Sequence, residues 1–203
     1  MKIHALMASI AATWVLSMAP VHAQEAAWQS SYQLEAAGKY TEAMAAIDGV
    51  PANGPDAELK ILRRGWLTYL PGRFDESIRE YRQAIERNPK SVDARLGLTL
   101  PLLAAKRWRE AEQAAQAALN LAPNNYTAML RLVIALEAQQ DWNMMLKIAA
   151  SMAASYPSDA SAYVYLARAN AWLGKRDEAV AAYTATLSRY PGHLEAKAYL
   201  AKK

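Results

Sequence analysis

Few side chains in this sequence could take part in catalysis or bind a metal. The chain of 203 residues has no cysteine and three histidines, and His4 and His22 both lie within the first 23 residues. His193 alone is too little for a multi-histidine metal site. The carboxylates of Glu110 and Glu112 are two positions apart, so on a helix they point in different directions. With no glycine-rich phosphate loop either, we predict no catalytic residue, no metal, no cofactor and no enzymatic activity.

The first 23 residues have the layout of a cleavable secretory signal peptide. Lys2 precedes an apolar stretch over residues 3–18, Pro20 breaks the helix, and Ala23 is a small residue at the predicted cleavage point. The stretch is short for the ~20 residues of a membrane-spanning helix. We therefore expect cleavage before Gln24 and no stable membrane anchor afterwards, with an uncleaved anchor as the alternative. The predicted location is the periplasm.

The net charge gives no indication of a nucleic acid partner. It is +4 for the whole chain and +3 once Lys2 leaves with the signal peptide. A mild excess of this size is common in helical proteins with a solvated surface. We predict that nucleic acid is not a partner.

The rest of the chain is organised by a period of thirty-four residues. Prolines recur at this spacing at Pro55, Pro89, Pro123, Pro157 and Pro191. Aromatic residues recur with it at Tyr40, Phe74, Trp108 and Trp142, and the equivalent position in the last unit holds Arg176. Small residues recur at Ala43, Ser77, Ala111 and Ala179, with Met145 as the exception. A fixed period of this length indicates a repeat array, in which each unit buries its apolar face against the next.

These residues resemble the tetratricopeptide repeat family, whose thirty-four-residue unit is a helix-turn-helix pair with small residues at close contacts and a proline at its end. The resemblance extends from Gln24 onward. It implies an all-α fold: a right-handed α-solenoid of five tandem helix-turn-helix units with a short C-terminal capping helix. The implied units are 24–57, 58–91, 92–125, 126–159 and 160–193, followed by a cap at 194–203, all within a single domain over 24–203.

Residues between the predicted helices agree with this register. Side-chain oxygens that could cap backbone amides directly precede the first helices of units three, four and five, at Ser91, Asn125 and Asp159. Glycines that allow a positive φ lie in the turn between the two helices of a unit, at Gly38, Gly72 and Gly174.

The resemblance also implies a binding surface. In this family the first helices line a concave face, and ligand contacts usually fall at places two, five, six, nine, twelve and thirteen of the unit. Here these places hold aromatic, aliphatic and arginine side chains, a composition typical of protein-binding grooves. The predicted groove residues are Arg63, Trp66, Tyr69, Leu100, Arg131, Ile134, Tyr165, Arg168 and Trp172. The lysine and asparagine with which some members clamp a terminal carboxylate are absent.

Two interpretations of these side chains stay open. The aliphatic residues, such as Leu96 and Leu130, are better explained by packing between neighbouring first helices than by ligand contact. For the aromatic residues and the arginines the two explanations are evenly matched, because both residue types are enriched at binding hot spots.

We therefore expect a non-catalytic protein–protein interaction scaffold in the cell envelope, which binds a peptide or helix segment of a partner in its concave groove. The alternative is a self-associating spacer, or an accessory subunit of a pilus, secretion or exopolysaccharide-export assembly. This alternative predicts a homo-oligomer formed through the C-terminal repeat. The named assemblies rest on analogy alone.

Overall fold

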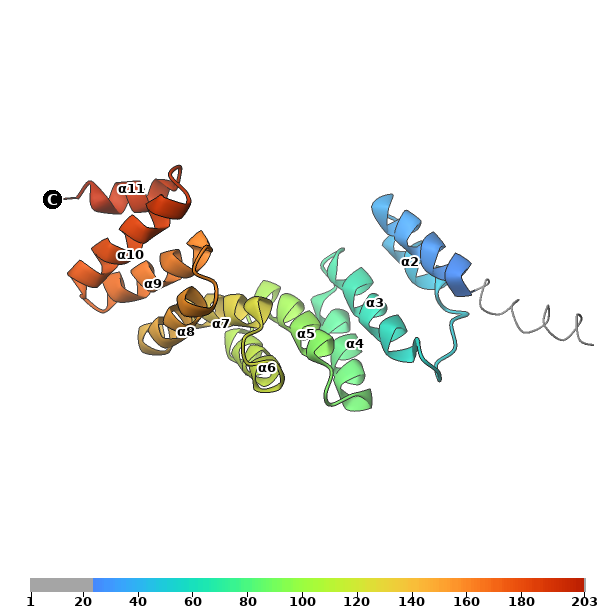
Figure 1. Ribbon diagram of the computed structural model, residues 1–203. Coiled ribbons are helices and arrows are strands. Elements are labelled where there is room, and N and C mark those ends of the chain that lie inside the picture. Colours follow the sequence, from blue (N-terminus) through green and yellow to red (C-terminus); the bar gives the residue numbers. More distant parts are fainter. Residues whose placement is uncertain (1–23, 203) are drawn as a thin grey trace, which may run out of the picture. The chain divides into compact units, whose positions relative to one another are not determined.

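The computed structural model describes residues 24–202, which form two compact units, unit 1 (24–88) and unit 2 (89–202). All secondary structure in these residues is helical, and the helices follow one another as antiparallel pairs (Figure 1). The predicted all-α fold class is therefore confirmed. The predicted signal peptide lies outside the described residues. No helix in the described range is long and apolar enough to cross a membrane.

Unit 1 consists of two helix pairs. Residues 24–36 are helical, and their Leu34 packs against Ala43 and Met44 of α2 (Tyr40–Ala46). The helix α3 (Ala57–Tyr69) packs with α4 (Phe74–Arg87). The small residue Gly65 lets α3 and α4 come close together, because a Cβ atom at this position would lie 2.9 Å from the Tyr81 ring. The Ser77 hydroxyl donates a hydrogen bond of 2.7 Å to the Gly65 carbonyl in the same contact.

Unit 2 consists of three helix pairs and a short final helix. The pairs are α5 (Val92–Ala104) with α6 (Trp108–Leu121), α7 (Tyr126–Gln139) with α8 (Trp142–Ser155), and α9 (Ala160–Trp172) with α10 (Arg176–Arg189), and the final helix is α11 (Leu194–Leu200). Alanines of the second helices, including Ala115 and Ala149, pack against Leu132, Leu136 and Met145. These small side chains allow close helix contacts in a core that has no disulfide to support it.

The first helices of unit 2 begin at the predicted caps. The side chains of Ser91 and Asn125 accept hydrogen bonds of 3.0 Å from the backbone amides three residues later, and Asp159 accepts one of 3.1 Å. These caps satisfy amides that have no partner within the helix. The helices they cap start at intervals of thirty-four residues, as the period predicts. The count of five repeats and the single domain stay predictions.

One backbone conformation recurs at the end of every first helix. Five residues at intervals of thirty-four have a left-handed φ of between 58° and 85°, namely Gly38, Gly72, Lys106, Gln140 and Gly174. The amide of the following residue donates a hydrogen bond of 2.8–3.0 Å to the carbonyl five residues before it. This is the Schellman pattern that closes a helix. The three predicted turn glycines are confirmed, and Lys106 and Gln140 adopt the same conformation without being glycine.

Replacing Gln140 by glycine should therefore stabilise the protein by about 0.5–1 kcal/mol, because a side chain at a left-handed φ is strained and glycine is not. The midpoint of urea denaturation measures the change. Gly72→Ala is the matched control: an added Cβ meets no atom within 4 Å there, so only backbone strain is introduced. It should lower the stability by about 1 kcal/mol. A lower midpoint for Gln140→Gly would contradict this account of the turn.

Candidate functional site

Arg63, the first of the predicted groove residues, is buried within unit 1. Its side chain is 5% exposed, and its Nε donates a hydrogen bond of 3.1 Å to the Ser31 hydroxyl. Its Nη1 is paired with the Glu35 carboxylate, and the guanidinium carbon lies 4.0 Å from the centre of the Tyr32 ring. Arg63 thus joins α3 to the preceding first helix, at residues 24–36. Its Nη2 is buried without a hydrogen-bond partner in the described chain.

Trp66 and Tyr69 lie next to Arg63 on α3 and are half-buried. Trp66 Nε1 donates a hydrogen bond of 2.7 Å to the same Glu35 carboxylate. Its ring is 5.6 Å from Tyr69, which in turn is 5.9 Å from Phe74. The structure therefore brings the three predicted residues of unit 1 together, and Glu35 is the shared acceptor that holds two of them.

Arg131 in unit 2 repeats the arrangement of Arg63. Its Nη1 donates a hydrogen bond of 2.9 Å to the Thr99 hydroxyl and a second one to the Leu96 carbonyl. In both units the hydroxyl lies thirty-two residues before the arginine, on the preceding first helix. The acceptors of Arg131 lie on α5, which continues through Pro101 without a break. Arg131 thus joins α7 to α5, while the nearby predicted residues Leu100 and Ile134 are half-buried.

Arg168 connects α9 to two other helices, α7 and α11. Its Nε and Nη2 donate to the Glu195 carboxylate of α11 at 2.8 and 2.5 Å, and its Nη1 donates to Glu137 of α7 at 3.2 Å. The Tyr183 hydroxyl of α10 donates to the same Glu195 carboxylate at 2.7 Å. Arg168 also lies 5.5 Å from the centre of the half-buried Tyr165 ring. We call Arg168, Glu137, Glu195 and Tyr183 the Arg168 network.

This network shifts the proton affinities of its members. The hydrogen bond from Arg168 lowers the pKa of Glu195. Burial, followed by the hydrogen bond to Glu195, raises the pKa of Tyr183. Burial and the nearby Glu137 raise the pKa of Tyr165. At neutral pH the carboxylate is therefore charged and the tyrosines are neutral, so the network is complete.

Trp172 is the exposed member of the predicted set, with 68% of its surface accessible. Its ring stacks on Trp142 of α8, with ring centres 5.0 Å apart and planes inclined by 5°. We call these two residues the tryptophan pair. Trp142 belongs to the aromatic series of the repeat but was not among the predicted binding residues. The stacked partner supports the Trp172 ring while leaving a large part of it open to solvent.

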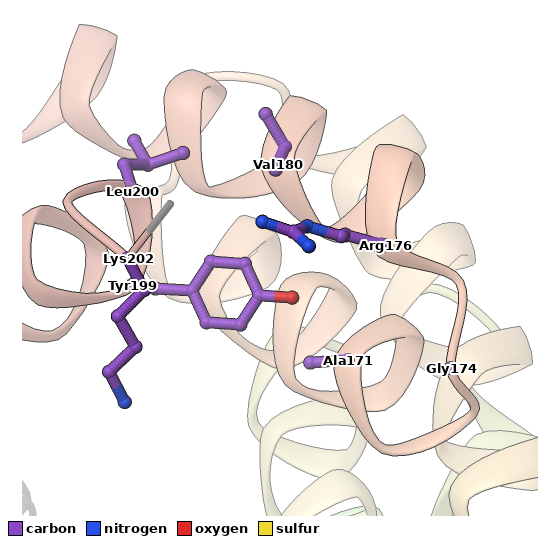
Figure 2. Close-up of a pocket in the computed structure, with 7 residues that line it drawn as sticks. All are labelled: Ala171, Gly174, Arg176, Val180, Tyr199, Leu200 and Lys202. Atoms are coloured by element: carbon purple, nitrogen blue, oxygen red, sulfur yellow. The ribbon is translucent and has the colours of Figure 1, made fainter.

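A pocket of about 400 Å³ lies where α9, α10 and α11 meet, and it is lined by residues other than those of the predicted groove. Its lining residues are Ala171, Gly174, Arg176, Val180, Tyr199, Leu200 and Lys202 (Figure 2). None of them was among the predicted site residues. The sequence signal that could have pointed to it is the break in the aromatic series at Arg176.

Comparisons with known proteins agree with this architecture. Residues 71–125 and 161–193 match family models of the tetratricopeptide repeat. The chain therefore contains tetratricopeptide repeats, and its helical fold is that of tetratricopeptide repeat proteins. No curated protein matches the chain in sequence.

Three solved structures illustrate the similarity of fold. MamA is 19% identical with a TM-score of 0.72, and the match covers 79% of this chain and 94% of that chain. YrrB, a tetratricopeptide repeat protein with an unusual peptide-binding site, is 17% identical with a TM-score of 0.71, covering 85% and 89%. A tetratricopeptide repeat protein from Parabacteroides merdae is 16% identical with a TM-score of 0.75, covering 88% and 71%.

Proposed function

We propose that this protein is a non-catalytic interaction scaffold that binds a peptide or helix segment of a partner protein. The observation that carries the proposal is the tryptophan pair of unit 2. Large aromatic side chains contribute most to binding when they dock into a partner and lose water there. Trp172 offers such a surface, because 68% of it is accessible.

The stacking of Trp172 on Trp142 is a second feature that favours binding. A side chain that is already held in place loses little conformational entropy when a partner docks. The parallel stack on Trp142 holds the Trp172 ring in this way. Arg131 and Arg168, by contrast, already bond to neighbouring helices, so we assign them to the support of the surface rather than to partner contact.

We propose that the scaffold acts in the cell envelope, in the periplasm, and the predicted secretory signal supports this location. The fold that this chain shares with YrrB is consistent with a peptide ligand, since that protein has a peptide-binding site. The partner segment should present an apolar side chain to the tryptophan pair, because the open face of an indole ring is mainly apolar.

Replacing Trp172 by alanine should weaken partner binding at least tenfold while leaving the thermal midpoint nearly unchanged, because the side chain is exposed. The chain from Gln24 onward is used as bait for separate periplasmic and cytosolic extracts, and the retained proteins are identified. The affinity of each retained protein is then compared between the wild-type bait and the variant.

Leu121→Ala is the matched control, because Leu121 is also an exposed apolar residue of unit 2 but ends a second helix, α6. Binding that survives Trp172→Ala, or that is lost equally in both variants, would exclude the tryptophan pair as the site. Partners found in the cytosolic extract alone would contradict the periplasmic location. Retention of the chain itself would favour the alternative, a self-associating spacer.

A further inference from the structure

The pocket at α9, α10 and α11 lies where the repeat pattern changes. One repeat earlier, Trp142 at the start of α8 stacks on Trp172 near the end of α9. The equivalent residue at the start of α10 is Arg176 rather than an aromatic one. An aromatic stack like that of Trp142 on Trp172 is therefore not formed by the residue at the start of α10.

The floor of this pocket is apolar and preformed. Ala171, Val180 and Leu200 contribute aliphatic surface, and Tyr199 contributes its ring. The Tyr199 ring is held by Tyr183, whose ring centre is 4.5 Å away. Figure 2 shows that Tyr199 and Arg176 reach toward one another from opposite sides of the pocket. A volume of about 400 Å³ lies within the range of small ligand sites.

The charged groups that line this pocket are all cationic. Arg176 and Lys202 are both exposed, and neither forms an ion pair within the described chain. The nearest carboxylates on α10 belong to Asp177 and Glu178, and neither lines this pocket. Glu178 instead lines a separate hollow with Tyr163 and Ala182. The pocket thus combines an apolar floor with two cations that form no ion pair within residues 24–202.

We propose that this pocket is a second binding site, which takes an acidic protein segment in which a carboxylate side chain lies next to a large apolar side chain. The apolar side chain would occupy the floor, and the carboxylate would pair with Arg176 and Lys202. Arginine suits this role because its planar guanidinium can donate two parallel hydrogen bonds to one carboxylate. Neither tryptophan of the pair lines the pocket, so the proposal is independent of the proposed function.

The test is an NMR titration of the full, isotope-labelled chain with blocked peptides. The probe peptide is Gly-Glu-Leu-Glu-Gly. Two comparison peptides are used: Gly-Gln-Leu-Gln-Gly, which lacks the charge, and Gly-Glu-Ala-Glu-Gly, which lacks the large apolar side chain. We expect the probe to shift the amides of Gly174, Val180 and Leu200. Both comparison peptides should bind at least fivefold more weakly than the probe. Added salt should lower the affinity of the probe itself, because it screens the charge contact.

Two variants locate the charge contact. Arg176→Gln should lower the affinity for the probe at least fivefold. Adding Lys202→Gln to this variant should lower the affinity again. Both residues are exposed, so the fold should be kept, which the amide spectrum itself verifies. Arg109→Gln is the matched control, because Arg109 is an exposed arginine of α6 outside the pocket, and it should leave binding unchanged.

Three outcomes would overturn the proposal. The first is the absence of shifts at the three amides with millimolar probe. The second is equal binding of the charged and uncharged peptides, which would mean a purely apolar contact. The third is a shift of these amides with protein concentration alone, which would show that a second copy of the chain occupies the pocket. Shifts confined to the indole of Trp172 would also overturn this proposal, because the pocket amides would be unaffected. They would show that the probe binds at the tryptophan pair of the proposed function.

Discussion

Replacing Arg63 by alanine should lower the free energy of unfolding of unit 1 by about 2–4 kcal/mol. Arg63 is 5% exposed and joins α3 to the helix over residues 24–36 through Ser31 and Glu35. Its removal leaves a largely buried carboxylate without its cation. We expect the lower part of the range, because one nitrogen of Arg63 already lacks a partner and Glu35 retains the hydrogen bond from Trp66.

Amide hydrogen exchange measures this effect where it occurs, since protection should fall in residues 24–36 and α3. The matched control is Arg79→Ala, which removes an exposed arginine from α4 in the same unit and should change the stability by less than about 0.5 kcal/mol. Unchanged protection of residues 24–36 in Arg63→Ala would show that apolar packing alone holds the two helices.

Replacing Arg168 by alanine should release α11 and cost about 2 kcal/mol, because Arg168 is the cation that pairs with Glu195 and Glu137. Amide protection of α11 should fall to near zero while that of α5 and α6 is kept. Lys147→Ala on α8 is the control, since it removes an exposed cation outside the network. Retained protection of α11 in Arg168→Ala would mean that the contact of Ala196 with Ala167 and Ala182 is sufficient.

The same network should make the docking of α11 sensitive to acid. The folded-state pKa of Glu195 is lowered, so its contribution to stability is complete above the unfolded pKa of about 4.3 and is lost as the pH falls through the lower folded value. Exchange of the α11 amides measured between neutral and acidic pH should show this loss, and Glu195→Gln should remove it. An equal acid response in wild type and Glu195→Gln would assign it to other carboxylates.

The sequence was sufficient to predict the fold class, the residues that cap the starts of helices and the glycines that follow their ends. A period of thirty-four residues defines equivalent positions, and the caps and turn glycines depend on residues next to them in the chain. Ser91 and Gly72 could therefore be interpreted without a structure. Gln140 could not, because its left-handed φ is imposed by the helices on either side and not by its own preference.

The roles of the arginines were not predictable in the same way. A repeat period shows which positions are equivalent, but not whether a long polar side chain points to solvent or across to the next helix. Arg63, Arg131 and Arg168 all bond to a neighbouring first helix, with acceptors 28 to 35 residues away. The explanation favoured for the aliphatic residues, packing between first helices, thus applies to these arginines as well. Whether the nine predicted residues contact a partner stays a prediction.

The hydroxyl–arginine bridges imply that the repeats of this protein are not interchangeable modules. Ser31 precedes Arg63 by thirty-two residues and Thr99 precedes Arg131 by the same interval, whereas Val133 precedes Tyr165. A shuffled chain that placed the repeat containing Arg63 directly after the repeat containing Val133 would bring a guanidinium against an aliphatic side chain with no acceptor. The order of the repeats is therefore encoded in matched pairs across their boundaries, and permuting them should produce misfolded arrays.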